Sequence, residues 1–177
     1  KLIYSATSMQ LGIKENENLS PYAWSKAKNV ELIKNFSKWY NLNYSLAYFF
    51  NVYGKQQISS GVMASVIGIF EKQYRKKINL TVVRPGTQKR DFTHIDDVID
   101  GTILCAIKGK KKSYYIGSGK AYSILKIAKT FNKKIKYIPK RPGEKFTGKA
   151  NLTLAKKELG YKPKHDLLKY IDRFKKY

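Results

Sequence analysis

The chain has 177 residues, of which 42% are hydrophobic, so it can bury a sizeable core, and its composition argues against a disordered chain. Its formal net charge is +24, yet lysines occur along most of the chain, which weakens the inference of a nucleic-acid partner. Because no apolar stretch approaches the roughly 20 residues that cross a bilayer, we expect a cytoplasmic protein without a membrane partner.

The first predicted elements are a strand, a helix and a second strand. Residues 1–6 are apolar and short, as in a buried strand, and residues 44–50 show the same pattern. Ser20 and Pro21 are typical of an N-cap and a first helical residue. The helix runs to about residue 40, with an inner face predicted from Ala23, Ala27, Val30, Ile33, Phe36 and Tyr40. This order favours parallel pairing of the two strands.

The rest of the chain continues to alternate between strands and helices. We predict helices at about residues 61–76, 98–107, 123–131, 152–159 and 166–175, strands at 80–83, 113–116 and 135–138, and an extended piece at 90–95. Asp96 or Asp97 is expected to cap the helix at 98–107. Cys105 lies in an apolar run without a disulfide partner, which indicates a buried thiol in a reducing compartment.

Tyr22 and Lys26 lie four residues apart in the first predicted helix, so their side chains share one face. A phenol has a reference pKa of about 10, and a neighbouring ammonium lowers that value because it favours the phenolate. Tyr22 is therefore a candidate general acid and base, with Lys26 tuning its pKa. Since the chain has 14 tyrosines and 36 lysines and arginines, chance also produces this spacing, and other motifs must support the interpretation.

Several later motifs occur in an order that is known from one family. Residues 90–98 are Arg-Asp-Phe-Thr-His-Ile-Asp-Asp-Val, 115–119 are Tyr-Ile-Gly-Ser-Gly, 141–144 are Arg-Pro-Gly-Glu and 159–163 are Leu-Gly-Tyr-Lys-Pro. Together with the Tyr-x-x-x-Lys helix, they resemble the NAD-dependent sugar-nucleotide epimerases and dehydratases, the extended short-chain dehydrogenases/reductases. The resemblance covers the whole chain.

This resemblance implies an α/β fold in which the C-terminal part of a Rossmann-like doubly wound parallel sheet is followed by a smaller α/β substrate-binding lobe. Residues 1–60 would form the second half of the NAD-binding domain, and residues 80–107 would partly return to it. Residues 61–79 and 108–177 would form the smaller lobe.

The resemblance also implies NAD as cofactor and roles for residues of the first half. Tyr22 would remove a sugar hydroxyl proton while hydride leaves for the nicotinamide, and Thr7 would bond the same sugar oxygen. Lys26 would hold the nicotinamide ribose and lower the pKa of Tyr22. Ser5 and Phe50 would contact the cofactor beside them.

A nucleotide sugar, most simply a UDP-hexose, is the substrate that the resemblance implies. Asn51, Arg90 and Arg141 would contact its diphosphate, and the planar guanidinium suits this task because it pairs bidentately with phosphate oxygens. Glu144 would bond the ribose of the nucleotide. The same family resemblance leads us to expect a homodimer formed through the Tyr22 helix and the helix that starts near Gly61.

The chemistry that we predict is epimerisation, as in a UDP-glucose 4-epimerase. Dehydratase members carry an Asp-Glu pair directly after the threonine, since loss of water needs a further acid and base, whereas Ser8 and Met9 stand here. Three alternatives stay open: a nucleotide-sugar reductase or dehydratase of the same family, a non-catalytic fragment, and, more remotely, a basic nucleic-acid-binding module.

Two kinds of binding motif are missing from the sequence. A glycine-rich dinucleotide fingerprint is absent, and Gly117-Ser118-Gly119 does not replace it because Tyr122 stands where its last glycine would be. We therefore expect the NAD-binding half to lie upstream, and the chain by itself neither to bind NAD tightly nor to turn over. His94, His165 and one distant cysteine have no ordinary zinc-ligand spacing, so no metal is expected.

Overall fold

The computed structural model describes residues 1–11, 20–61, 63–139 and 148–176. Its strands are β1 (Leu2–Thr7), β2 (Tyr44–Phe49), β3 (Val52–Tyr53), β4 (Leu80–Val83), β5 (Lys89–Asp91), β6 (Thr93–His94), β7 (Ser113–Ile116), β8 (Ala121–Ser123) and β9 (Ile135–Ile138). Its helices are α1 (Pro21–Tyr40), α2 (Val66–Arg75), α3 (Ile95–Lys108), α4 (Ile124–Thr130) and α5 (Leu167–Phe174), with a 3-10 turn η1 (Ser8–Gln10) and a π-helical turn η3 (Ala155–Leu159).

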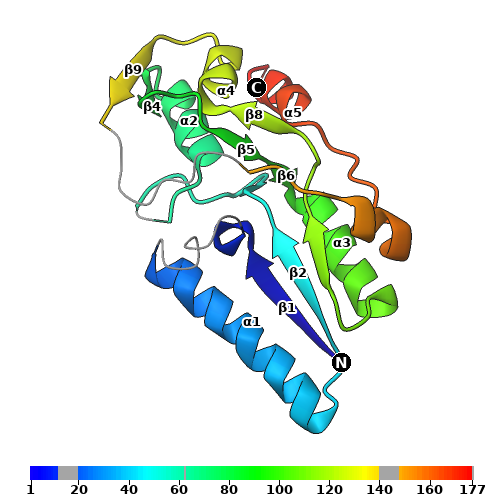
Figure 1. The fold of residues 1–177 in the computed structure, drawn as a ribbon. Coiled ribbons are helices and arrows are strands. Elements are labelled where there is room, and N and C mark those ends of the chain that lie inside the picture. Colours follow the sequence, from blue (N-terminus) through cyan, green and yellow to red (C-terminus); the bar gives the residue numbers. More distant parts are fainter. Residues whose placement is uncertain (12–19, 62, 140–147, 177) are drawn as a thin grey trace.

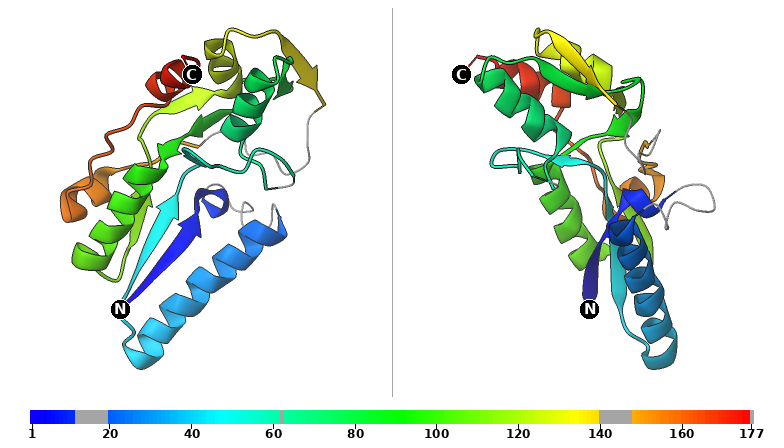
Figure 2. Two further views of the ribbon diagram at one scale, coloured as in Figure 1. Left: turned by 180° about the vertical axis from the view of Figure 1, so that it is seen from behind. Right: turned by 90° about the vertical axis from the view of Figure 1, so that its left-hand side faces the viewer.

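A parallel sheet with strand order β1-β2-β7 forms the larger part of the fold. Leu2 lies opposite Tyr44, and Leu46 lies opposite Ser113. The helices α1 and α3 cover opposite faces of this sheet, so three layers are stacked (Figures 1 and 2). The predicted strand-helix-strand unit and the α/β fold class are confirmed.

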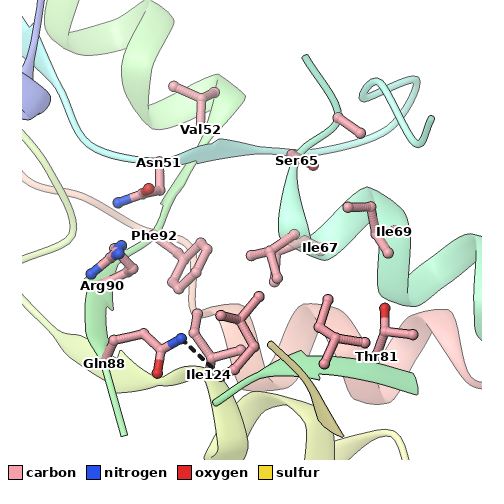
Figure 3. A pocket seen from close by; sticks show the side chains of 14 residues that line it. Asn51, Val52, Ser65, Ile67, Ile69, Thr81, Gln88, Arg90, Phe92 and Ile124 are labelled. Carbon is pink, nitrogen blue, oxygen red and sulfur yellow. Dashed lines mark hydrogen bonds between the residues drawn. The ribbon is translucent and has the colours of Figure 1, made fainter. Parts of the chain in front are cut away.

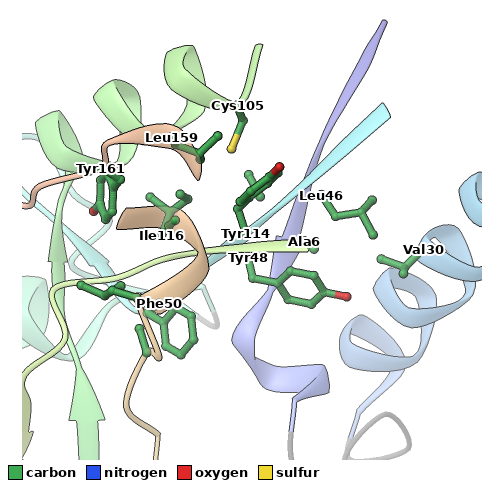
Figure 4. Packing of buried hydrophobic residues seen from close by; sticks show 14 of the residues in the cluster. Ala6, Val30, Leu46, Tyr48, Phe50, Cys105, Tyr114, Ile116, Leu159 and Tyr161 are labelled. Atoms are coloured by element: carbon green, nitrogen blue, oxygen red, sulfur yellow. The ribbon is translucent and has the colours of Figure 1, made fainter. Parts of the chain in front are cut away.

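Apolar side chains from both helices meet the sheet in one continuous core. Val30 and Ile33 of α1 pack on one face and Cys105 of α3 packs on the other, with Tyr114 of β7 buried near them (Figure 4). Cys105 is a free, fully buried cysteine, and burial raises the pKa of its thiol to about 11. The predicted core thiol is confirmed.

The smaller lobe has its own sheets and its own core. β4 pairs in parallel with β9, β5 pairs antiparallel with β8, and the short strands β3 and β6 are parallel. The helices α2, α4 and α5 pack there, and a second cluster of buried residues includes Ile67, Phe70, Ile127, Phe131 and Ile171. Figure 1 shows this lobe next to the carboxyl ends of β1 and β2, which the arrowheads mark.

The strand pairing differs from the predicted division of the chain. β7, which the sequence assigned to the smaller lobe, pairs with β2, because Tyr114 and Ile116 are apolar side chains that the larger core buries completely. β4 instead joins the smaller lobe by pairing with β9. Of residues 80–107, it is chiefly α3 that returns to the larger sheet, on which it packs.

Local details of three helices also differ from the predictions. α3 starts at Ile95 and its cap is His94, whose ring nitrogen accepts the N–H of Asp96, so neither predicted aspartate caps it. α2 starts at Val66 because Ser65 caps it. On α1, Phe36 and Tyr40 are 42% and 73% exposed, so the buried face is narrower than predicted. Among the described residues, no helix is long and apolar enough to span a membrane.

Candidate functional site

The carboxyl end of β1 provides the first side chain of the site. Thr7 is the last residue of the strand and is 7% exposed. Its hydroxyl accepts the N–H of Met9 at 3.2 Å, so Thr7 also caps the turn η1. Because β1, β2 and β7 are parallel, their carboxyl ends lie at one edge of the sheet, which is where open α/β sheets bind ligands.

The start of α1 brings Tyr22 and Lys26 to the same edge. Ser20 caps the helix by accepting the N–H of Ala23 at 3.1 Å, and Pro21 follows as the first helical residue. The Lys26 ammonium donates to the carbonyl oxygen of Ser5 at 2.9 Å. Since this bond ties α1 to β1 two residues before Thr7, the predicted Ser5 and Lys26 are direct neighbours. Tyr22, one helical turn earlier, is 49% exposed.

Lys26 has a second contact that holds its side chain. Its ammonium lies 4.9 Å from the centroid of the Tyr4 ring, and the Tyr4 hydroxyl accepts a hydrogen bond from Asn29 of α1 at 3.1 Å. The facing residues of β1 and α1 therefore restrain the lysine in one position. This restraint leaves the less buried Tyr22 side chain as the group that a ligand can reach.

A separate pocket of about 370 Å³ lies beyond β2 in the smaller lobe and contains Asn51 and Arg90 (Figure 3). Their polar ends occupy the same part of the pocket, whereas Ile67, Ile69 and Phe92 form its apolar wall. An amide and a guanidinium side by side suit the binding of phosphate oxygens. The pocket thus brings together two of the predicted substrate-binding residues.

Backbone contacts fix Asn51 at this position. It adopts φ 27°, in the left-handed region that asparagine tolerates better than most residues. Its side-chain amide nitrogen donates to the main-chain carbonyl of Asp91 at 2.8 Å. The main-chain carbonyl of Asn51 accepts the N–H of Thr93 at 3.3 Å. These bonds hold the end of β2 against the segment that carries Arg90. Phe50, predicted to contact the cofactor, is 3% exposed and packs edge-on against Tyr115.

Asp91, which the sequence analysis did not identify as a site residue, holds together the segments next to the pocket. Its carboxylate is fully buried and accepts four hydrogen bonds, from the N–H and hydroxyl of Ser118 and from the N–H groups of Gly119 and Ala150, at 2.6–3.0 Å. A Cβ at Gly117 would lie 2.2 Å from that of Ala150, which explains the glycine. The segments 90–98 and 115–119 thus form one hydrogen-bonded unit that positions Arg90.

Asp97 and Tyr161 join the C-terminal motif to the same unit. The buried Asp97 carboxylate accepts the backbone N–H groups of Lys164 and His165 at 2.9 and 3.0 Å. The Tyr161 hydroxyl donates to the Gly117 carbonyl at 3.0 Å, and burial raises the pKa of this phenol. These motif residues therefore have structural roles.

Two predicted site residues, Arg141 and Glu144, lie outside the described residues. The pocket contains three further polar side chains that the sequence did not indicate as ligand-binding, Ser65, Thr81 and Gln88. Ser65 could have been recognised as a helix cap, since it accepts the N–H of Gly68 at 3.0 Å. Gln88 is 2% exposed and donates to the Val83 carbonyl, and no local sequence signal marks it.

Known proteins resemble the chain in both sequence and fold. The sequence profile of the NAD dependent epimerase/dehydratase family matches residues 3–124. A provisionally named UDP-glucose 4-epimerase of Methanocaldococcus jannaschii is 32% identical over 160 residues, which are 88% of this chain and 52% of that protein. The chain therefore spans about half the length of this relative.

Solved structures superpose on nearly the whole chain. The UDP-glucose 4-epimerase of Thermotoga maritima, crystallised with UDP-glucose, has a TM-score of 0.88 and 26% identity, and the match covers 99% of this chain and 62% of that one. The UDP-glucuronic acid 4-epimerase of Bacillus cereus, crystallised with UDP-glucuronic acid and NAD, has a TM-score of 0.87 and 26% identity. That match covers 99% of this chain and 60% of the other.

Proposed function

Because this chain belongs to the NAD dependent epimerase/dehydratase family, we propose that it supplies the catalytic half of an NAD-dependent nucleotide-sugar epimerase. The observation that carries the proposal is the Lys26–Ser5 bond, which sets the start of α1 at the strand edge that ends in Thr7. Its substrate would be a UDP-hexose, since relatives that resemble the chain are named for UDP-sugars.

The described residues fit the nicotinamide end of NAD. Tyr22 is half exposed, and its hydroxyl makes no hydrogen bond within the described residues, so it is available to a ligand. Bound NAD would accept a hydride from the sugar and return it. The sequence offers no glycine-rich loop for the pyrophosphate, so a dinucleotide-binding segment outside these 177 residues has to complete the site.

Each catalytic residue would then have one task. Tyr22 would take the proton of the sugar hydroxyl and later give it back, and the Thr7 hydroxyl would bond the same oxygen. The Lys26 ammonium would stabilise the phenolate through its charge. At the nucleotide end of the substrate, Asn51 and Arg90 would hold the diphosphate, because their side chains share one pocket.

The turn after Thr7 supports epimerisation over dehydration. Dehydration needs a further acid and base beside the tyrosine. The turn η1 offers Ser8, Met9 and Gln10, and none of these is a carboxylic acid. Reductase chemistry uses the same tyrosine and cofactor and is therefore the second candidate, which the assay below distinguishes.

The test is to substitute Tyr22 in the chain preceded by a dinucleotide-binding segment of this family. Tyr22→Phe should lower the interconversion of UDP-glucose and UDP-galactose at least about 10²-fold, because the phenyl ring cannot carry the proton. The affinity for UDP-glucose should stay within about twofold, since Asn51 and Arg90 are unchanged.

Tyr137→Phe is the matched control, because Tyr137 is an exposed tyrosine of β9 that lies outside every proposed contact and should keep full activity. Unchanged turnover in Tyr22→Phe would reject the proposed role. Net consumption of NADH, without release of the epimer, would indicate a reductase instead.

We also propose that the protein is a homodimer formed through α1. Leu32, Phe36, Trp39 and Tyr40 are 42–73% exposed, and the three aromatic rings lie 5.4–6.4 Å apart, which makes a continuous apolar surface. Such surfaces are typical of protein contacts. The burial of α2 does not support the second predicted contact, because its apolar residues Ile67 and Phe70 lie in the core of the smaller lobe.

A further inference from the structure

A second and larger cleft, of about 1170 Å³, lies in the described part of the smaller lobe and shares no lining residue with the pocket of Asn51 and Arg90. Side chains of α2, α5 and the start of α3 border it. It contains His94, the last residue of β6, together with Asp96 in the first turn of α3 and His165 just before α5. None of these three residues has a role in the proposed reaction.

The donor atoms of these three side chains converge. Asp96 Oδ2 lies 3.4 Å from His94 Nδ1 and 3.7 Å from His165 Nε2, and one donor atom from each residue fits within a 4.8 Å group. A tetrahedral metal ion with bonds of about 2.0–2.1 Å holds its ligand atoms roughly 3.3 Å apart. The two measured separations to Asp96 are close to that value.

The hydrogen bonds of His165 leave the correct nitrogen free for a metal. Its Nδ1 lies 3.0 Å from a carboxylate oxygen of Asp97, which is buried and also accepts two backbone N–H groups. The proton of a neutral His165 ring therefore belongs on Nδ1, and the lone pair on Nε2 faces Asp96. Histidines that bind metals are oriented by a carboxylate in this way.

The Nδ1 atom of His94 also lies beside the Asp96 carboxylate, at 3.4 Å. This nitrogen accepts the N–H of Asp96 at 3.2 Å, so it carries no proton in the neutral ring. An ion at this point would be bound by Asp96 Oδ2 and His165 Nε2, and His94 Nδ1 would exchange its bond with the Asp96 N–H for a bond to the ion. The nearby ammonium of Lys164 does not take the place of this ion, because it pairs with Asp100 at 2.8 Å.

We propose that His94, Asp96 and His165 bind a transition-metal ion of borderline softness, such as Zn²⁺ or Ni²⁺. The two imidazole rings stack with centroids 4.2 Å apart and an angle of 19°, so one ring turns toward the ion when it binds. The ion links the start of α3 to the segment before α5.

The affinity is moderate, because seven basic side chains line the cleft and their charges oppose a cation: Lys55, Arg75, Lys77, Lys133, Lys164, Lys169 and Arg173. The carboxylates of Asp96 and Asp166, which also line the cleft, offset part of this charge. Mg²⁺ prefers an octahedron of oxygen ligands and is not expected to bind here. The inference is independent of the proposed epimerase reaction.

Titration calorimetry and thermal unfolding of the chain, freed of any histidine tag, test the site with ZnCl₂, NiCl₂ and MgCl₂. We expect one Zn²⁺ or Ni²⁺ per chain and a rise in Tm, and no effect of Mg²⁺. His165→Gln and Asp96→Asn should each weaken Zn²⁺ binding at least about tenfold. Asp172→Asn, which removes an exposed carboxylate of α5 outside the cleft, should leave it unchanged.

The Tm of each variant in EDTA shows whether it still folds. Electron paramagnetic resonance of the wild-type chain with one equivalent of Cu²⁺ gives a second readout, in which coupling to two imidazole nitrogens is expected. Absence of Zn²⁺ and Ni²⁺ binding, binding that His165→Gln leaves intact, equal loss in Asp172→Asn, or a Cu²⁺ signal without nitrogen coupling would each overturn the proposal.

Discussion

Neighbouring residues of one motif differ in whether they line the pocket or hold the fold together. In the segment at 90–98, Arg90 faces the pocket, whereas Asp91 points into the protein and accepts four hydrogen bonds. Asp97 likewise accepts three hydrogen bonds from the segment before α5. A buried carboxylate with this many donors holds two loops in place, so the neighbouring half-buried Arg90 keeps its position in the pocket.

At this scale we predict that Asp91→Asn destabilises the protein by about 3 kcal/mol, because an amide NH₂ would face backbone donors that lose their acceptor. Urea unfolding at neutral pH measures the change. Asp100→Asn removes an exposed carboxylate of the nearby helix and should stay within about 0.5 kcal/mol of wild type. A loss below about 1 kcal/mol for Asp91→Asn would show that the network adds little.

Caps decide where the helices of this chain begin. Serines at positions 20, 65 and 123 each accept an N–H three residues later, and the helix starts directly after each of them. Asp166 does the same for α5, since one of its oxygens accepts the N–H groups of Leu168 and Lys169. Its other oxygen accepts the Lys120 ammonium at 2.9 Å, so this cap also ties α5 to the loop before β8.

We therefore predict that Asp166→Ala costs about 1 kcal/mol of stability at neutral pH. Burial raises the pKa of Asp166, but the Lys120 ammonium and the backbone donors outweigh burial and hold the pKa below its usual range. A lowered folded pKa means that the stabilisation is present above the unfolded value of about 3.9 and is lost as the pH falls through the folded value. The gap between wild type and variant should therefore narrow below about pH 4.

Urea unfolding of both proteins at pH 7 and pH 3 checks this expectation. Asp172→Asn, on the exposed side of α5, serves as the control and should differ little from wild type at either pH, because surface ion pairs contribute little. A gap of the same size at both pH values would argue against the ionised cap.

Among the residues that the structure describes, the two helices that cover the larger sheet each expose apolar side chains that the core does not use. One surface is the aromatic side of α1 described above, and the other consists of Ile99, Ile103 and Ile107 on α3, which are 49–71% exposed. α1 and α3 cover opposite faces of the larger sheet (Figure 2), so the two surfaces can serve different contacts. We assign the α1 surface to the proposed homodimer, because the aromatic side chains of this surface are contiguous.

For the assembly we predict that Trp39→Lys lowers the molar mass in light scattering from that of a dimer to that of a monomer, because the ammonium would be buried in an apolar interface. Ile107→Lys places the same charge on α3 and should leave the dimer intact. A monomeric wild type, or an equal effect of both substitutions, would contradict the assignment of α1.

The local pattern of apolar and capping residues was sufficient to predict the first strands and helix of the fold. The unit of β1, α1 and β2 followed from apolar strands and a capped, periodic helix, since residues within about twenty positions determine such elements. The order of the motifs indicated the family, and the spacing of Tyr22 and Lys26 placed both side chains on one helical face.

Contacts between distant segments needed the tertiary structure. The pairing of β7 with β2, the bonds from Asp91 to Ser118 and Gly119, and the meeting of His94 with His165 join residues far apart in sequence. Propensity and periodicity carry no information about such contacts, because the packing of two cores decides which segments meet. The sequence by itself determined the local elements and the family, and the tertiary structure decided which of the motif residues line a pocket and which are buried in hydrogen-bonded contacts, because those contacts join distant segments.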